Sequence, residues 1–232
     1  MASERNIKTW RDPYDSGFST TRLKNITLKS GLTIFVGCNG AGKTTLIHNI
    51  ADVLKQEKIP YFKFDNLQDG GSKSIGEMIF RNQMAAAANI WTSSEGENIT
   101  NNLYPIFSKA KTFIETGENI YANRFAKIFN SDKDEPVSSN ERWFLFDAID
   151  SGYSIDNVIE IKSAFNAMIE DAKQSNIDLY IIVTANAYEM AHKENCFDVM
   201  SGKYITFNNY DEYKKFIIKT REKKEKRYAN SK

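Results

Sequence analysis

A glycine-rich run near the amino terminus constrains the fold of this chain more than any other feature. It reads Gly37-Cys38-Asn39-Gly40-Ala41-Gly42-Lys43-Thr44-Thr45 and fits the pattern G-x-x-x-x-G-K-[ST] at every fixed position. The apolar residues 32–36 before it predict a buried strand, and residues 45–54 after it carry apolar side chains at helical spacing. The sequence therefore predicts a strand, a tight loop and a helix in immediate succession.

This succession is chemically suited to binding phosphate. The loop and the helix N-terminus direct several backbone N–H groups and the positive end of a helix dipole at one small anion. Lys43 can reach the outer phosphates of a nucleotide, and the Thr44 hydroxyl can hold Mg²⁺. The residues expected to contact ATP are Asn39, Gly40, Ala41, Gly42, Lys43, Thr44 and Thr45. The alternative is a glycine-rich turn that matches the pattern by chance.

Composition excludes several classes of protein. The chain has 232 residues, 41% hydrophobic and 26% charged, with a net charge of +1, which is typical of one soluble globular domain. Only two cysteines and two histidines are present, so a disulfide framework or a Cys/His metal site is not expected. There is no apolar run of membrane-spanning length and no secretory signal, so we expect a cytoplasmic protein without a membrane partner.

The chain alternates apolar strands with helices, which predicts one α/β domain with a mainly parallel, doubly covered sheet. Strands are expected near 23–28, 32–36, 60–64, 143–146 and 179–183, and helices at 45–54, 74–88, 98–115, 155–173 and 210–227. The sheet core comprises 20–68 and 143–210, with a helical lobe inserted at about 69–142 that ends in a polar connector at 130–142. Residues 210–232 form a basic C-terminal helix and tail.

A second element of a nucleotide site follows the lobe. Phe144-Leu145-Phe146-Asp147 is an apolar strand that ends in a carboxylate, the form of a Walker B element. Ligands of open α/β sheets bind at the carboxyl ends of the strands, so Asp147 is expected to hold Mg²⁺ through water. The alternative is a surface aspartate that ends a core strand.

These motifs together resemble the ABC-type ATPases. The run at residues 37–46 looks like their P-loop, and Asp150-Ser151-Gly152-Tyr153-Ser154 resembles the loop that they send across a dimer interface. The chain is similar to the chromosome-maintenance and DNA-repair branch, and most like its short phage-encoded ATP-binding proteins. The resemblance implies a P-loop NTPase fold and a homodimer that closes around ATP and Mg²⁺, with a possible role in DNA metabolism.

The resemblance also suggests two less specific sites. Ser93-Ser94-Glu95-Gly96-Glu97 loosely resembles the ABC signature, in which Ser94 and Gly96 would contact the partner's nucleotide. Ser94 and Glu97 equally fit a capping box for the helix that follows. The signature lies about fifty residues before Asp147, farther than is usual in the family. Gln68 is the candidate for the glutamine that senses Mg²⁺ and water.

Two departures from the family bear on activity. Ala148 stands where a catalytic Glu usually follows the Walker B Asp, and Ala185 stands at the position of the switch His. Asp150, Glu95 or Asn186 could position the attacking water instead. We therefore expect Lys43, Asp147 and Asp150 to support weak or partner-stimulated ATP hydrolysis.

Two alternatives remain to hydrolysis. The first is a nucleotide-controlled binding switch that does not hydrolyse ATP. The second is a nucleoside or nucleotide kinase, which the scarcity of arginine in the lobe disfavours, because residues 65–120 supply only Arg81. Tyr14 and Phe18 are candidates for an adenine-stacking aromatic or for a purely structural role.

The C-terminal tail concentrates positive charge. Residues 214–232 hold nine Lys or Arg and two Glu, a charge of +7 in a chain whose net charge is +1. A charge run of this kind is either a solvated helix face or a contact for DNA or an acidic protein. The helical lobe is the other place where a protein partner is expected.

Overall fold

The computed structural model describes residues 3–9, 23–66, 95–118 and 139–229. In chain order the elements are β1 (Glu4–Lys8), β2 (Asn25–Lys29), β3 (Gly31–Val36), α1 (Lys43–Gln56), β4 (Tyr61–Asp65), α4 (Glu95–Thr116), β5 (Glu141–Asp147), α6 (Ile155–Gln174), β6 (Asp178–Thr184), α7 (Tyr188–Ala191), β7 (Cys196–Asp198), β8 (Lys203–Ile205) and α8 (Tyr210–Ala229). Within these ranges, no helix is both long enough and apolar enough to cross a membrane.

The described strands form a small sheet and a large one. β1 and β2 pair antiparallel, while the larger sheet has the order β4-β5-β6-β3-β7-β8. All its neighbouring strands pair in parallel except β7 and β8. The fold is therefore mixed α/β with a mostly parallel central sheet, as the alternation of strands and helices predicts. We call the side where β3, β4, β5 and β6 end the carboxyl edge, and the side where they begin the amino edge.

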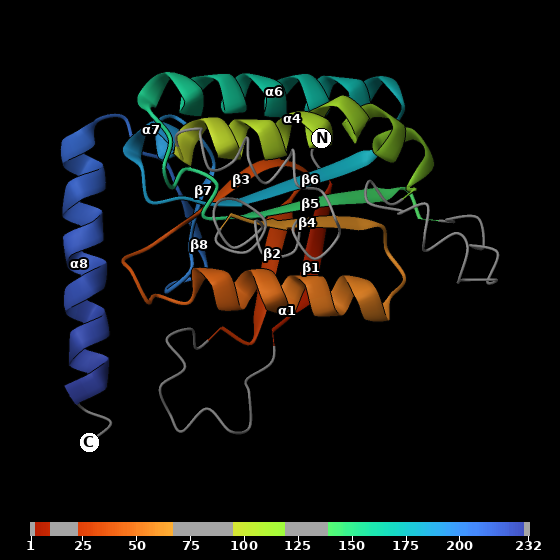
Figure 1. The fold of residues 1–232 in the computed structure, drawn as a ribbon. Coiled ribbons are helices and arrows are strands. Elements are labelled where there is room, and N and C mark those ends of the chain that lie inside the picture. Colours follow the sequence, from red (N-terminus) through yellow and green to blue (C-terminus); the bar gives the residue numbers. More distant parts are fainter. Residues whose placement is uncertain (1–2, 10–22, 67–94, 119–138, 230–232) are drawn as a thin grey trace, which may run out of the picture.

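Helices cover both faces of the large sheet, with α1 on one face and α4 and α6 on the other (Figure 1). Alternate residues of β5 serve the two faces. Trp143 and Leu145 belong to the core that α1 covers, whereas Phe144 and Phe146 belong to the core that α4 and α6 cover. Because both faces are buried, the strands read as continuous apolar runs.

Helix α4 is the described part of the predicted helical lobe, and it packs on the sheet. Phe113 meets Phe144 edge to face, with ring centroids 5.0 Å apart. The buried Arg142, at the start of β5, donates from Nε to the Phe113 carbonyl at 3.2 Å. This contact ties the C-terminal end of α4 to the amino edge, so α4 begins toward the carboxyl edge (Figure 1). Its C-terminal half is part of the main core.

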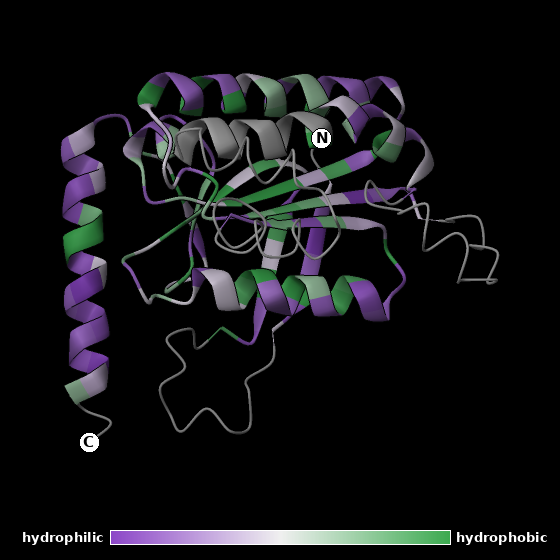
Figure 2. Cartoon of the chain, in the orientation of Figure 1, coloured by the Kyte–Doolittle hydropathy of each residue, from purple (hydrophilic) through white to green (hydrophobic). Residues whose placement is uncertain are grey.

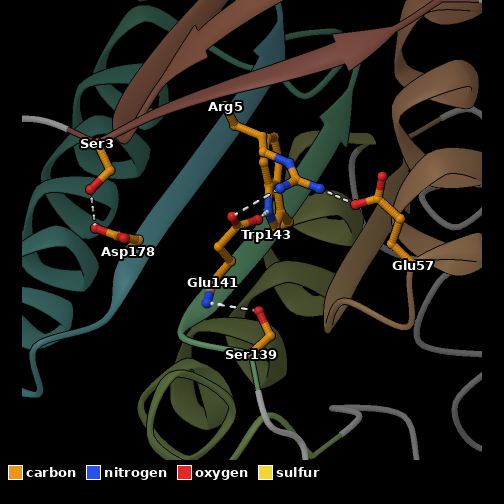
Figure 3. Close-up of polar contacts among 7 residues, drawn as sticks. All are labelled: Ser3, Arg5, Glu57, Ser139, Glu141, Trp143 and Asp178. Atoms are coloured by element: carbon orange, nitrogen blue, oxygen red, sulfur yellow. Dashed lines mark hydrogen bonds and ion pairs between the residues drawn. The ribbon is translucent and has the colours of Figure 1, made fainter.

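Polar contacts close the amino edge and fasten β1 to it (Figure 3). Arg5 of β1 pairs with Glu57, just after α1, and lies 3.6 Å from the carboxylate of Glu141. Ser3 donates to Asp178 at 2.5 Å. The Trp143 indole donates to Glu141 at 3.2 Å. The small sheet is thereby fixed against the first residues of β5 and β6.

The predicted strands and helices that fall among the described residues are present, with ends shifted by a few residues. The helix expected at 74–88 lies outside the described residues. The sequence predicts a polar connector at 130–142, which is too long, because β5 already begins at Glu141. The sequence pattern does not predict β1, α7, β7 or β8, because these elements are short or polar.

Candidate functional site

The glycine-rich loop joins β3 to α1 at the carboxyl edge. Gly40 and Gly42 have φ angles of 73° and 98°, which glycine adopts without strain, and these allow the loop to turn into the helix. α1 begins at Lys43, and no described side chain caps its N-terminus. The first N–H groups of a helix lack intrahelical partners and lie at the positive end of its dipole. This end of α1 therefore favours an anion.

Lys43 is a buried cation, only 9% exposed. Its Nζ donates to the carbonyl of Gly37 at 2.9 Å, so the side chain folds back along the loop. Burial lowers the pKa of Lys43, while the nearby Cys38, Asp150 and Asp147 act in the opposite direction. Burying a charge is costly unless it meets a partner, so a lysine held here is suited to an anionic ligand.

Asp147 ends β5, as the sequence predicts, and is buried. The Thr184 hydroxyl at the end of β6 donates to Asp147 at 2.5 Å and accepts from the Ala148 N–H at 2.7 Å. β6 lies between β3 and β5, so Thr184 orients the Asp147 carboxylate from the strand next to the loop strand. Thr184 was missed from sequence, because its role depends on strands that are neighbours only in space.

Asp150 is buried just beyond Asp147 and joins two loops. Its Oδ2 accepts from the backbone N–H groups of Asn186 at 2.6 Å and Ala187 at 2.5 Å. Its Oδ1 is buried and has no hydrogen-bond partner among the described residues. Burial raises the pKa of Asp150, against the effects of the two backbone N–H groups and Lys43. One carboxylate oxygen thus holds the loop after β6, and the other is left for a ligand.

Asn66, directly after β4, was also missed from sequence. Its amide donates to the carbonyls of Ala148 at 3.0 Å and Ser151 at 2.9 Å. Its Oδ1, like that of Asp150, is buried without a hydrogen-bond partner in the part of the chain that the structure describes. The signal that could have identified Asn66 is its position as a polar residue directly after an apolar strand, because the carboxyl ends of parallel strands meet at one edge of the sheet.

The residues at this edge fit a magnesium ion that arrives with phosphate. Among the described residues, no group of three or more His, Cys, Asp or Glu could hold a metal ion by itself. Mg²⁺ usually takes one or two carboxylates, several waters and substrate phosphates, so it needs no such cage. The buried Asp147 carboxylate, the exposed Thr44 hydroxyl and the orphaned oxygens of Asp150 and Asn66 supply the hard oxygen chemistry that Mg²⁺ prefers.

Helix α8 stands beside the loop at the carboxyl edge (Figure 1). The N–H of Cys38 donates to Thr220 at 3.2 Å, and Lys224 donates to the Asn39 carbonyl at 2.9 Å. The Tyr213 hydroxyl donates to the Asn186 carbonyl at 2.7 Å. Tyr213 is buried and Phe216 and Ile217 are partly buried, so these residues form the inward face of the helix. The sequence did not predict where α8 would lie.

The structure brings together part of the predicted site. The loop, Lys43, Asp147 and Asp150 lie at one edge, joined by Asn186 through Asp150. Gly96 lies in the first turn of α4, which begins toward the same edge. Gln68, Ser94, Tyr14 and Phe18 lie outside the described residues. Ala148 follows β5 with a φ angle of 52°, and Ala185 is buried after β6. Both side chains are methyl groups, so neither can form a hydrogen bond to water.

No protein-family profile, curated protein or solved structure matches this chain. The chemistry of the carboxyl edge is therefore judged from its own residues.

Proposed function

We propose that this chain is an ABC-type P-loop protein that binds ATP with Mg²⁺ and hydrolyses it weakly or with the help of a partner. The observation that carries the proposal is Lys43, a buried lysine that reaches along a glycine-rich loop to Gly37. Beside it, an uncapped helix N-terminus and buried carboxylates share the carboxyl edge of a parallel sheet. Phosphate, Mg²⁺ and a nucleotide are the ligands that this combination suits.

Each group has a distinct part in binding. The backbone N–H groups of residues 39–45 cradle the phosphates, and Lys43 binds the outer ones. Thr44 and Asp147 hold Mg²⁺, which neutralises charge on the outer phosphates when bound. Two strand spacings, roughly 10 Å, separate β3 from β5, so Asp147 would hold Mg²⁺ from the far side of the site from the loop, through water.

Hydrolysis needs a group that orients water for in-line attack on the terminal phosphate. Ala148 has no carboxylate to offer. Among the described residues, Asp150 is the best substitute, because its Oδ1 is buried, has no hydrogen-bond partner in this part of the chain and interacts electrostatically with Lys43. Its other oxygen is fixed by two N–H groups, which restricts its movement and favours slow turnover.

A non-hydrolysing switch is the second candidate, favoured by Ala148 alone. Such a protein would change its binding partners on ATP binding without appreciable phosphate release. The two functions are separated by measuring phosphate release and ATP affinity on the same sample.

Two surfaces support the proposed partners. Ile155 and Ile159, one turn apart on α6 directly after residues 150–154, are 61% and 56% exposed. An apolar pair at this position suits an ATP-dependent homodimer, which light scattering with and without ATP would detect. The exposed lysines of α8 suit DNA or an acidic protein (Figure 2).

The experiment that tests ATP binding compares two lysines of the same helix. Lys43→Ala should reduce ATP affinity at least a hundredfold by calorimetry, because it removes the cation of the loop. Lys55→Ala, on an exposed residue near the end of α1, should leave the affinity unchanged. Equal ATP affinity in the two variants would overturn the site.

A further inference from the structure

Helix α8 is held to the loop although it is largely hydrophilic (Figure 2). Among its described residues only Tyr213 and Thr220 are fully buried. Thr220 is 1% exposed, accepts from the Cys38 N–H and donates to the Ile217 carbonyl at 2.8 Å. The polar side chain of Thr220 therefore fixes α8 against the loop. Apolar packing alone would not fix the helix at one particular residue.

A pocket of about 830 Å³ lies between α8 and the loop. Gly37, Cys38, Asn39 and Asn186 line one side. The other side carries three cations of α8, namely Lys214, Arg221 and Lys224, together with the carboxylate of Glu225. The volume is within the range of small-molecule sites, and the lining combines loop backbone with positive charge. Such a lining suits an anion already held by the loop.

The pocket adjoins the outer end of the phosphate cradle. Lys43, which binds outer phosphates in loops of this pattern, reaches back to the Gly37 carbonyl. Gly37 is also in the pocket lining, as is Asn186, whose N–H is held by Asp150. The terminal phosphate would therefore lie nearer to the cations of α8 than the inner phosphates would.

Lys224 and Arg221 are placed to use this proximity. Lys224 bonds to the Asn39 carbonyl, and its Nζ lies 3.3 Å from the point that a Cβ on Gly40 would occupy. An ammonium has three donors, so Lys224 can keep this bond and still donate to a phosphate oxygen. Arg221 pairs with Glu225 at 3.0 Å on the exposed side of one helix, a weak pair that a phosphate can replace.

We propose that α8 completes the nucleotide site within the same chain, with Lys224 and Arg221 binding the terminal phosphate of a nucleoside triphosphate. The inference rests on the proposed ATP-binding function and adds a selectivity to it. α8 distinguishes the triphosphate from the diphosphate, because only the triphosphate extends to the cations beyond the loop.

The test measures affinities for ATP, its β,γ-imido analogue and ADP by calorimetry with Mg²⁺. Lys224→Gln and Arg221→Gln should each weaken binding of the two triphosphates about tenfold, the order expected for one charge-assisted hydrogen bond. ADP affinity should stay unchanged. Lys219→Gln and Lys223→Gln are matched controls, because these exposed lysines of α8 do not line the pocket.

The possible outcomes separate the role of α8 from the proposed ATP-binding function. Unchanged triphosphate affinity in the Lys224 and Arg221 variants, with binding still lost in Lys43→Ala, would overturn the role of α8 and leave the proposed function standing. Tighter triphosphate binding would also overturn it, since α8 would then be a competitor for the loop. A wild-type protein that binds neither ATP nor ADP would overturn the proposed function and the role of α8 with it.

Discussion

The two edges of the central sheet treat charge in opposite ways. At the amino edge, Arg5, Glu57 and Glu141 form ion pairs with side chains 28%, 45% and 20% exposed. The Nε of Arg5 is buried without a hydrogen-bond partner among the described residues, but both of its terminal nitrogens are paired with a carboxylate. Arg142 is buried there, yet it donates to three backbone carbonyls. At the carboxyl edge, Lys43, Asp147 and Asp150 are all below 10% exposed, and one oxygen of Asp150 has no hydrogen-bond partner within the described ranges.

This difference separates stability from function. Partly exposed ion pairs contribute little to stability, and a buried arginine with three acceptors is satisfied where it stands. Buried charges that are only partly satisfied cost free energy of folding, so their presence indicates a ligand that completes them. The amino edge is expected to matter for folding alone, and the carboxyl edge for binding.

The largest stability change should follow Asp150→Ala. The variant leaves the N–H groups of Asn186 and Ala187 without their acceptor, each costing about 1–3 kcal/mol. Removal of a buried charge offsets part of this, so we expect a net loss of about 2 kcal/mol in urea unfolding. Asp178→Ala, which loses only the bond from Ser3 at the amino edge, should cost less than about 1 kcal/mol. Equal losses would remove the distinction between the edges.

Under the proposed function, Ala148→Glu should raise ATP turnover, because it adds a carboxylate where the ABC-type ATPases that the sequence resembles carry their catalytic Glu. We expect an increase of about tenfold or more in phosphate release, within the usual contribution of a positioned acid–base group. Ala148 already has a positive φ, so another side chain adds little backbone strain. Ser139→Glu at the amino edge is the control and should leave turnover unchanged. A fast wild type whose turnover Asp150→Asn abolishes would contradict this prediction and assign the role to Asp150.

Arg5→Ala should have a smaller effect, confined to stability. Its ion pairs are partly exposed, so the free energy of unfolding should fall by about 1 kcal/mol or less, and less still at high salt. ATP affinity should remain that of the wild type, since Arg5 lies at the opposite edge from the loop. A loss of ATP affinity without unfolding would show that the two edges are coupled.

Much of the fold could be predicted from sequence, because residues such as Phe144 and Ile181 lie in strands buried on both faces. Continuous apolar runs and a matched loop pattern identify such strands without knowledge of their neighbours. β1 could not be found this way, since only Ile7 of its residues is buried. β7 is too short, at three residues, to show a period.

The candidate site was predictable where one segment holds the chemistry, as in the loop and Asp147. Asn66 and Thr184 were not predictable, because their partners come from strands adjacent in space and distant in sequence. The same holds for Thr220, which meets Cys38 across 182 positions of the chain. The spacing of Tyr213, Phe216 and Ile217 indicates which face of α8 is buried, but not which surface covers it.

The smallest effect is a pH trend that separates Asp150→Asn from the wild type. Burial raises the pKa of Asp150 in the folded state above the ordinary value of 3.8. The folded state therefore holds this proton more tightly, and the stability it provides is present below pH 3.8 and lost as pH rises through the raised pKa. Asn cannot ionise, so Asp150→Asn should gain stability relative to the wild type across that window. Urea unfolding at a series of pH values measures this difference in the free energy of unfolding.

Arg142→Met is the matched change at the amino edge. Its free energy of unfolding should differ from that of the wild type by the same amount at every pH in that window, because a guanidinium remains charged throughout the acid range. An Asp150→Asn difference that is equally flat would mean that the carboxylate is fully satisfied in the folded protein and needs no ligand to complete it.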